Sequence, residues 1–304
     1  SEDVIYPSLG LAIIDEQHRF GVNQRLLLAS KGERADLLLM SATPIPRTLA
    51  LTVYGDLDVS TLTDFPFKER MVETSIVSSD SKTIDAAIKK AIEEQRKIYV
   101  IAPTIIEGES GHFSTESLYA KFATKYPGKV GWLHGGMNSV QKEEALERFK
   151  NGILPILIST TVIEVGVDVK EASLMLIYDA THFGLAQLHQ LRGRIGRDGR
   201  KALCLLISDA EEEEKEKLSI LVSSNDGLKI AEEDLRLRGP GEMSGLKQSG
   251  LPNFSYVNII QDYKMFEFAR KDAETILKDP QNPAYRTFLT KAKNEALHAQ
   301  FTNV

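Results

Sequence analysis

Short apolar runs that alternate with helical segments constrain the fold of this chain more than any other feature. The helical segments are near residues 84–92, 115–125 and 139–150. Strands that alternate with helices of 10 to 15 residues form a parallel sheet with right-handed crossovers. We therefore expect a complete parallel α/β domain over residues 71–225. Its predicted strands are 98–102, 130–134, 154–159, 173–178 and 202–207.

Two further apolar runs lie near the start of the chain. Residues 9–15 end in Asp15, and residues 35–40 lead into Ser41-Ala42-Thr43. Polar residues at the carboxyl ends of neighbouring strands are typical of a site at the edge of an open α/β sheet. Two strands are too few for a whole sheet, so residues 1–70 are expected to be only part of a domain. Charged residues, Gly55 and Pro66 predict a linker over residues 55–75.

The composition excludes several classes of protein. No apolar run approaches the roughly 20 residues of a membrane span. The net charge of −6 argues against a histone-like binder of nucleic acid, although a local basic track remains compatible with it. The single cysteine, Cys204, lies in an apolar run and is expected to be a buried, inert thiol. These features fit a cytoplasmic protein.

Residues 159–200 combine a hydroxyl-rich turn with an arginine- and glycine-rich segment. The turn follows a predicted buried strand and begins Ser159-Thr160-Thr161, and the later segment contains four arginines. A guanidinium stays charged and can bind phosphate oxygens bidentately. Arg194 and Arg197 are three residues apart and would share a face on a helical turn. The segment therefore predicts phosphate contacts, while structural roles remain open for Arg192 and Arg200.

The second half of the chain ends in helices. A helix is expected to run to Arg238, where Gly239-Pro240-Gly241 stops it. A glycine- and serine-rich loop follows, then an amphipathic helix, and a last helix after Pro283. We expect residues 226–304 to form a helical hairpin and C-terminal helices.

Several strings together resemble motifs II, III, V and VI of superfamily 2 helicases. The finer resemblance is to RecG-type branch-migrating DNA helicases and covers about residues 1–280. It implies a partial first RecA-like lobe at 1–70, a complete second RecA-like lobe at 71–225, and a translocation hairpin with C-terminal helices at 226–304. The strings are Asp-Glu-Gln-His-Arg-Phe-Gly-Val (15–22), Tyr-Gly-Asp-Leu-Asp (54–58), Thr-Thr-Val-Ile-Glu-Val-Gly-Val-Asp-Val (160–169), Phe-Gly-Leu-Ala-Gln-Leu-His-Gln-Leu-Arg-Gly-Arg (183–194) and Asp-Leu-Arg-Leu-Arg-Gly-Pro-Gly-Glu (234–242).

The resemblance implies catalytic and nucleotide-binding roles for individual residues. Asp15 and Glu16 would hold Mg²⁺ and activate the attacking water, and Arg194 and Arg197 would contact the nucleotide, with Arg197 the better arginine-finger candidate. The residues implied to face the nucleotide are Gln190, Gly166 and Asp168. The residues implied to couple the nucleotide to DNA and the two lobes to each other are Gln17, His18, Ser41 and Thr43.

The resemblance also implies a DNA-binding set. Thr160 would contact a nucleic-acid phosphate, and His134 with Gly135 would let the backbone approach one. The remaining candidates lie in the segment that resembles the translocation motif, where a plain amphipathic helix and turn would explain the same letters. They are Arg236, Arg238 and Gln248.

The implied activity is ATP-dependent movement of double-stranded DNA, with ATP and Mg²⁺ as cofactors. Stalled forks and Holliday junctions would be the branched DNA partners, single-stranded-DNA-binding protein a further partner, and the motor a monomer with no membrane contact. No Gly-x-x-x-x-Gly-Lys-Ser/Thr string is present. Because that loop cradles the β- and γ-phosphates, we expect a fragment that lacks the wedge domain and the phosphate-binding loop and does not hydrolyse ATP alone.

Two other functions remain open on the sequence. One is the motor of a transcription-repair coupling translocase, which usually has Asp-Glu-Glu-His where this chain has Asp-Glu-Gln-His. The other is a non-catalytic nucleic-acid-binding module, which has no chemical need for the acids and arginines. The chain also departs from the family pattern at three places: Gly136 stands for an arginine, Lys170 for a proline, and Asp198-Gly199-Arg200 resembles the RNA-helicase version of motif VI.

Overall fold

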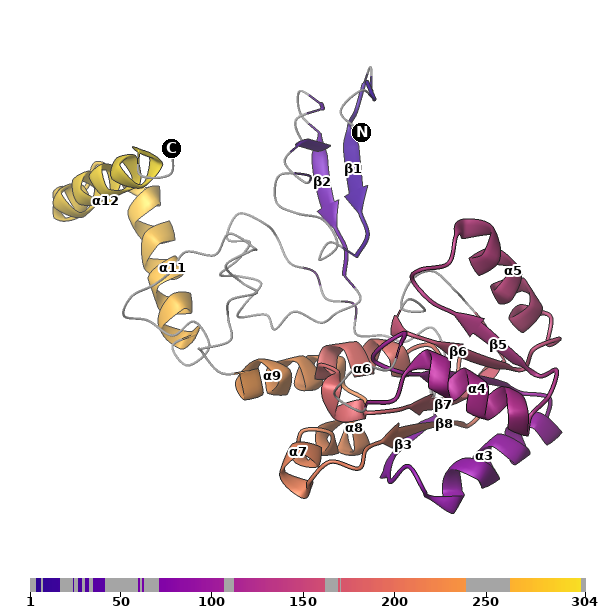
Figure 1. Ribbon diagram of the computed structural model, residues 1–304. Coiled ribbons are helices and arrows are strands. Elements are labelled where there is room, and N and C mark those ends of the chain that lie inside the picture. The colour runs from indigo at the N-terminus through magenta and orange to yellow at the C-terminus, as the bar shows by residue number, and fades with distance from the viewer. Residues whose placement is uncertain are drawn as a thin grey trace. The chain divides into compact units, whose positions relative to one another are not determined.

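The computed structural model describes most of the chain (Figure 1). By internal contacts the chain divides into one unit of residues 1–46 and 60–239 and a second of residues 47–59 and 240–304. The domain boundaries expected from the sequence stay a prediction. The described residues are 4–6, 8–16, 24, 27–28, 31–32, 35–41, 60, 62, 71–106, 112–161, 169, 171–238 and 263–301.

A six-stranded parallel sheet is the centre of the first unit. Its strand order is β3-β8-β7-β4-β6-β5, with every neighbouring pair parallel. The predicted strands and their parallel arrangement are therefore confirmed. The strands are β3 (Val72–Val77), β4 (Lys97–Ile101), β5 (Val130–Leu133), β6 (Ile156–Ser159), β7 (Ala172–Ile177) and β8 (Ala202–Ile207).

Alternate residues of the central strands face two separate apolar layers. In β4, Tyr99 and Ile101 lie in one cluster, and Ile98 and Val100 lie in the other. The first cluster contains side chains of α5 (Ser139–Lys150), α6 (Leu185–Arg192), α8 (Ser219–Ser223) and α9 (Gly227–Arg238). The second contains side chains of α3 (Lys82–Glu93) and α4 (Thr115–Lys125). A parallel strand covered on both faces is expected to be apolar throughout, as β4 and β6 are.

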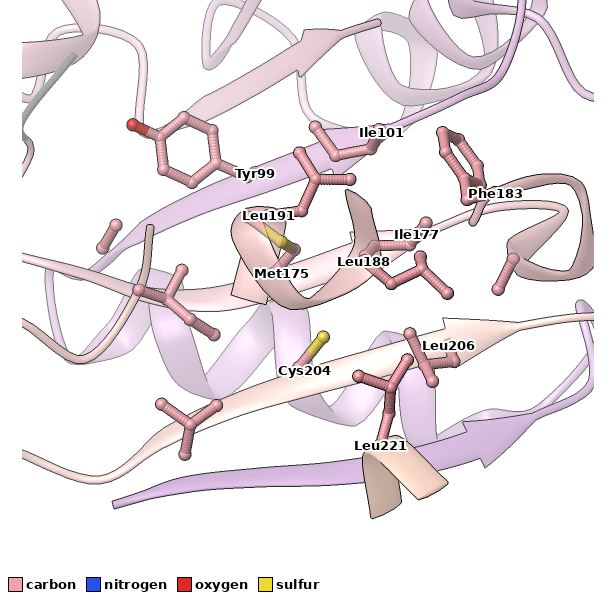
Figure 2. Close-up of a cluster of buried hydrophobic side chains, with 14 of the residues drawn as sticks. Tyr99, Ile101, Met175, Ile177, Phe183, Leu188, Leu191, Cys204, Leu206 and Leu221 are labelled. Atoms are coloured by element: carbon pink, nitrogen blue, oxygen red, sulfur yellow. The ribbon is translucent and has the colours of Figure 1, made fainter. Parts of the chain in front are cut away.

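The first layer is densely packed around β4, β7 and β8 (Figure 2). The rings of Tyr99 and Phe149 lie 4.9 Å apart, and Leu188 and Leu191 of α6 are buried beside Met175. Cys204 is fully buried in this layer, and burial raises the pKa of its thiol to about 12. The expectation of a buried, inert thiol is confirmed.

One predicted element differs from the structure, and another is confirmed. The linker expected over residues 55–75 is wrong at its end, because β3 begins at Val72 and forms the edge of the sheet beside β8. The helix expected to run to Arg238 is confirmed as α9, which ends there. Two shorter helices, α7 (Glu212–Glu216) and α8, precede it, and the Asp226 carboxylate accepts a hydrogen bond from the Leu228 amide where α9 begins.

A two-stranded parallel sheet is formed near the N-terminus by β1 (Leu11–Ile14) and β2 (Asp36–Leu39). Ala12 and Ile14 are buried, whereas Leu11 and Ile13 are about half exposed. The second unit contains α11 (Tyr263–Lys278) and α12 (Pro283–Phe301). No helix in the described part of the chain is long and apolar enough to cross a membrane.

Candidate functional site

The carboxyl ends of β1 and β2 bring predicted site residues to one edge. Ile14 pairs with Leu39, and the Met40 amide donates to the Ile14 carbonyl at 2.8 Å, so Ser41 follows at the same edge as Asp15 and Glu16. Asp15 is exposed and accepts a hydrogen bond from the Glu16 amide at 2.9 Å. Glu16 has a positive φ of 50°, a conformation that non-glycine residues adopt rarely and that clusters at functional sites.

The other residues of the predicted coupling set cannot be placed. Gln17, His18 and Thr43 lie outside the described residues, as do Gly166 and Asp168 of the nucleotide set. Their roles stay predictions.

Thr160 lies directly after β6 and is 8% exposed. The preceding residue, Ser159, is fully buried, and its hydroxyl has no hydrogen-bond partner among the described residues. Buried hydroxyls are normally hydrogen-bonded, so the Ser159 hydroxyl has capacity for a further partner. The hydroxyl-rich turn of the sequence is therefore next to a buried strand end, as predicted.

Helix α6 separates an apolar face from a polar one. Leu185, Leu188 and Leu191 point into the core (Figure 2). Gln190 is half-buried, and its Nε2 is buried with no hydrogen-bond partner in the part of the chain that the structure describes. At the other end of the helix, the Leu185 amide donates to the Asp234 carboxylate at 3.0 Å. A carboxylate at a helix N-terminus is stabilised by the free amides and the helix dipole, so α9 caps α6.

Helix α6 ends earlier than the three-residue spacing of Arg194 and Arg197 predicted. Helix α6 ends at Arg192, so Arg194 and Arg197 lie in turns and the helical face expected for them is wrong. A side chain at Gly193 would come within 2.8 Å of the Gln190 carbonyl, and Gly196 has φ of +69°. Glycine adopts this left-handed conformation without steric cost, so the glycines turn the chain back toward β8.

Both candidate arginine fingers are half-buried on this turn. The Arg197 Nε donates to the Gly193 carbonyl at 3.0 Å, and the Arg194 amide donates to the Leu191 carbonyl at 2.8 Å. The bond to Gly193 helps to fix the Arg197 side chain on this turn.

Arg192 has a structural role. Its residue is 4% exposed, and its Nη1 donates to the carbonyls of Leu221 at 2.6 Å and Ser224 at 3.0 Å. Burial lowers the pKa of its guanidinium. These contacts join the end of α6 to the end of α8, and they answer the question that the sequence left open for this arginine.

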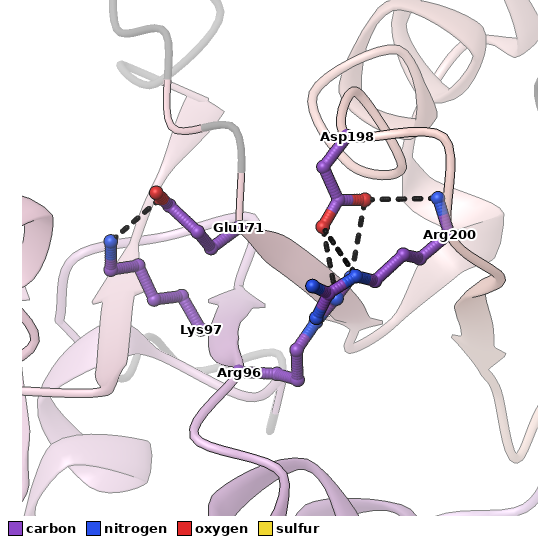
Figure 3. Close-up of polar contacts among 5 residues, drawn as sticks. All are labelled: Arg96, Lys97, Glu171, Asp198 and Arg200. Atoms are coloured by element: carbon purple, nitrogen blue, oxygen red, sulfur yellow. Dashed lines mark hydrogen bonds and ion pairs between the residues drawn. The ribbon is translucent and has the colours of Figure 1, made fainter.

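An ion pair that the sequence did not predict holds the arginine-rich turn (Figure 3). Arg96 Nη1 lies 2.9 Å from Asp198 Oδ2, and Arg96 Nη2 donates to Oδ1 at 3.3 Å. The two side chains are 5% and 18% exposed. Bidentate pairs fix geometry as well as adding energy, so the pair anchors the turn containing Arg197 to the residue before β4.

Arg200 lies at the outer end of the same turn. Its side chain is 73% exposed, its Nε lies 3.9 Å from Asp198 Oδ2, and its amide donates to Oδ1 (Figure 3). No sequence signal marked Arg96, because Arg96-Lys97 before an apolar strand is typical of a solvent-exposed flank. Lys97 is also buried, and it pairs with Glu171 at 2.8 Å.

The predicted DNA-binding residues at the end of β5 adopt a tight turn. His134 is half-buried against Trp132, with ring centroids 4.6 Å apart, and its Nδ1 is buried with no hydrogen-bond partner among the residues described. Gly135 is exposed, and its carbonyl accepts a bond from Lys142 at 3.1 Å. A side chain at Gly136 would meet the His134 ring at 3.3 Å, so a small residue here accommodates the histidine.

Arg236 is exposed on α9 and pairs with Glu233 at 2.8 Å. Arg238 is the last residue of α9, and its side chain lies outside the described residues. Gln248 also lies outside them. The DNA-binding roles of all three stay predictions.

Family models match two stretches of the chain. The model described as "Helicase conserved C-terminal domain" matches residues 82–199, and "ATP-dependent DNA helicase RecG, domain 3, C-terminal" matches residues 224–297. The ATP-dependent DNA helicase RecG of Bacillus subtilis (strain 168) is 42% identical over 302 residues, covering 96% of this chain and 44% of that protein. The chain is similar to RecG-type helicases over nearly its whole length. The resemblance read from its motifs is confirmed.

Other RecG-type proteins give a similar result. RecG of Synechocystis sp. is 43% identical, covering 92% of this chain and 34% of that protein. A solved structure of RecG bound to a three-way DNA junction is 40% identical with a TM-score of 0.64, covering 88% of this chain and 34% of that one. The chain thus spans less than half the length of these relatives.

A more distant structure shares the fold alone. Saccharomyces cerevisiae Dbp5 bound to RNA and ADP BeF3 is 15% identical with a TM-score of 0.51, covering 86% of this chain and 63% of that one. The RecA-like fold predicted for the complete lobe is confirmed.

Proposed function

We propose that this chain is a motor segment of an ATP-dependent double-stranded-DNA translocase that remodels stalled replication forks and Holliday junctions. The observation that carries the proposal is the turn after α6. Arg194 and Arg197 lie on this turn, which is anchored by the Arg96–Asp198 pair, and Gln190 of the preceding helix has a buried side-chain nitrogen with no hydrogen-bond partner among the described residues. This arrangement lies in a chain that is 42% identical to a RecG helicase.

The residues present fit a nucleotide and its metal ion. Two adjacent carboxylates, Asp15 and Glu16, suit Mg²⁺, which prefers oxygen ligands. Gln190 offers an unpaired buried donor, and two half-buried guanidinium groups follow it. When bound, Mg²⁺-ATP would supply the phosphoryl group whose transfer drives the motor.

Each residue would then have one role in hydrolysis. Asp15 would hold the metal ion, and Glu16 would orient the attacking water and accept its proton. Arg197, whose Nε donates to the Gly193 carbonyl, would stabilise the charge that develops on the phosphate. Such an arginine is worth about 10³–10⁵ in rate in related nucleotide hydrolases.

The coupling of hydrolysis to DNA movement would pass through α6. Its C-terminal end leads to the arginines, and its N-terminal end is capped by Asp234 of α9, two residues before Arg236. Arg192 joins α6 to the end of α8. A displacement of the arginine-rich turn would therefore be transmitted to α9 and to the segment that follows it.

The DNA would be held through its backbone. Thr160 and the Ser159 hydroxyl at the end of β6 are candidates for one phosphate, and the turn at His134-Gly135 for another. Arg236, Arg238 and Gln248 would contact the duplex from the translocation segment. We further propose that the motor is monomeric, acts in the cytoplasm and meets single-stranded-DNA-binding protein at forks.

A chimaera tests this function. The 304 residues replace the matching segment of Bacillus subtilis RecG, and ATP hydrolysis is measured with and without a three-way DNA junction. We expect junction-stimulated hydrolysis and junction unwinding. A chimaera that folds and binds the junction without stimulated hydrolysis would contradict the proposal, and the 304-residue chain alone is expected to release no phosphate.

A further inference from the structure

Three side chains outside the proposed nucleotide and DNA contacts converge at the carboxyl end of β7. His112 comes from the segment between β4 and α4, Asp179 follows β7, and His182 ends the short 3₁₀ helix η3 (Ala180–His182). One ligand atom from each lies within 4.8 Å of the other two. The His112 Nδ1 is 3.9 Å from the Asp179 Oδ2, and the two imidazole rings have centroids 3.9 Å apart.

The backbone holds the carboxylate in place. The Phe113 amide donates to the Asp179 Oδ2 at 2.7 Å, and the Phe113 ring packs on Tyr178 with centroids 4.9 Å apart. Asp179 adopts a left-handed conformation, with φ of 50° and ψ of 47°. Such a conformation in a non-glycine residue clusters at ligand clamps, and it turns the chain so that His182 comes back toward His112.

The ligand types select a class of metal. Two imidazoles and one carboxylate suit first-row transition ions such as Zn²⁺, whereas Mg²⁺ and Ca²⁺ prefer oxygen ligands alone. Around a tetrahedral zinc ion with bonds near 2.1 Å, ligand atoms lie about 3.4 Å apart. Small side-chain rotations bring the cluster from its present spacing to that value, because His182 is exposed and can turn.

We propose that His112, Asp179 and His182 bind a divalent transition-metal ion, with Zn²⁺ as the probe, and that water completes the coordination. The exposed His182 gives the ion a path of entry. A bound ion would connect His112, which precedes α4, to Asp179 in the turn after β7. These two residues are 67 positions apart in the chain. The site is chemically separate from the proposed Mg²⁺ site at Asp15 and Glu16 and does not depend on the proposed function.

The direct test uses the 304-residue chain with any affinity tag removed. Zn²⁺ is titrated against a chromogenic chelator, and Co²⁺ is added separately to look for the visible absorption of a tetrahedral cobalt site with nitrogen and oxygen ligands. We expect one equivalent of Zn²⁺ to bind and to raise the melting temperature. Mg²⁺ or Ca²⁺ at the same concentration should leave the melting temperature unchanged.

Variants locate the ion. His182→Ala and Asp179→Asn should each weaken Zn²⁺ binding at least about tenfold and remove the cobalt absorption. Asn tolerates the left-handed conformation of position 179, and circular dichroism checks that both variants fold. His134→Ala is the matched control, because His134 is a half-buried histidine that follows β5 and lies outside the cluster.

Two outcomes would overturn the site. One is a folded wild-type chain that binds no Zn²⁺ at stoichiometric concentration. The other is Zn²⁺ binding that survives both His182→Ala and Asp179→Asn but is lost in His134→Ala.

Discussion

The six-stranded sheet and the β1–β2 pair start from the same sequence pattern, a short apolar run that ends in polar residues. In the six-stranded sheet, helices cover both faces, and every residue of β4 and β6 is buried. In β1, by contrast, Leu11 is 51% exposed and Ile13 is 54% exposed. The sequence pattern therefore predicts that a strand forms. The neighbouring strands and helices determine how much the burial of that strand stabilises the fold.

Charged groups separate the two regions in the same way. In the six-stranded sheet, Arg192, Arg96 and Lys97 are nearly buried, and each has oxygen partners. At the end of β1, Asp15 is exposed. An enclosed charge must be paired because its desolvation is costly, whereas an exposed carboxylate remains accessible to a ligand.

Truncation of a buried apolar residue should separate the two regions most strongly. Phe149→Ala should lower the free energy of unfolding by about 3–5 kcal/mol, because the ring is fully buried against Tyr99. Ile13→Ala in β1 should cost less than about 1 kcal/mol, since half of that side chain is already in water. Urea unfolding measures the free energy of unfolding of both variants. Equal decreases in the two variants would contradict the difference in burial between the six-stranded sheet and β1.

Removal of a buried charge should come next. Arg192→Met should cost about 2–3 kcal/mol, because it leaves the carbonyls of Leu221 and Ser224 without their donor. The matched control is Arg200→Met, whose side chain is 73% exposed and which should change stability by less than about 0.5 kcal/mol. An Arg192→Met protein as stable as the wild type would contradict the structural role of this arginine.

The pair that anchors the arginine-rich turn should have a smaller effect. Asp198→Asn should cost about 1–2 kcal/mol, since it leaves the nearly buried Arg96 guanidinium without its counter-charge. Asp85→Asn is the control, because the Lys125–Asp85 pair has side chains 46% and 52% exposed and should contribute less than about 1 kcal/mol. A double-mutant cycle with Arg96→Met would show no coupling if the two side chains do not interact.

The smallest effect is a dependence on acid pH. Hydrogen bonds from Ser79 hold the pKa of Asp209 below its ordinary value of 3.8. A carboxylate whose pKa is lower in the folded state stabilises the fold above the unfolded pKa, and that stabilisation is lost as the pH falls through the folded pKa. Asp209→Asn should therefore reduce stability near neutral pH and flatten its decline below about pH 4. If Asp209→Asn lowers the free energy of unfolding equally at every pH, Asp209 does not contribute to the pH dependence.

The sequence predicts elements with local signals and misses those that depend on distant partners. The apolar runs predict β4 to β8 within about two residues, since each is a largely apolar and mostly buried strand. The edge strand β3 reads Val-Glu-Thr-Ser-Ile-Val and was assigned to a linker in part, because an edge strand with a single neighbour needs fewer apolar residues.

The candidate site follows the same rule. The phosphate contacts predicted for Thr160 and Arg197 from their local strings stay predictions. The role of Arg192 could not be resolved, since its partners are the carbonyls of Leu221 and Ser224, about 30 residues downstream. Arg96 and Asp198 are 102 residues apart, and only the folded sheet brings them together. Helix α6 ends at Arg192 with Gly193 as its C-cap, so Arg194 and Arg197 do not share a helical face.

The proposed function depends most directly on a contact between Arg197 and the nucleotide. The measurement is single-turnover ATP hydrolysis by the Bacillus subtilis RecG chimaera in the presence of a three-way junction, with Arg197→Ala compared with Arg200→Ala. We expect Arg197→Ala to lower the rate of ATP hydrolysis by about 10³-fold or more, with unchanged junction affinity and melting temperature. Arg200→Ala should hydrolyse ATP at nearly the wild-type rate. Hydrolysis by a folded Arg197→Ala chimaera at the wild-type rate would contradict this contact.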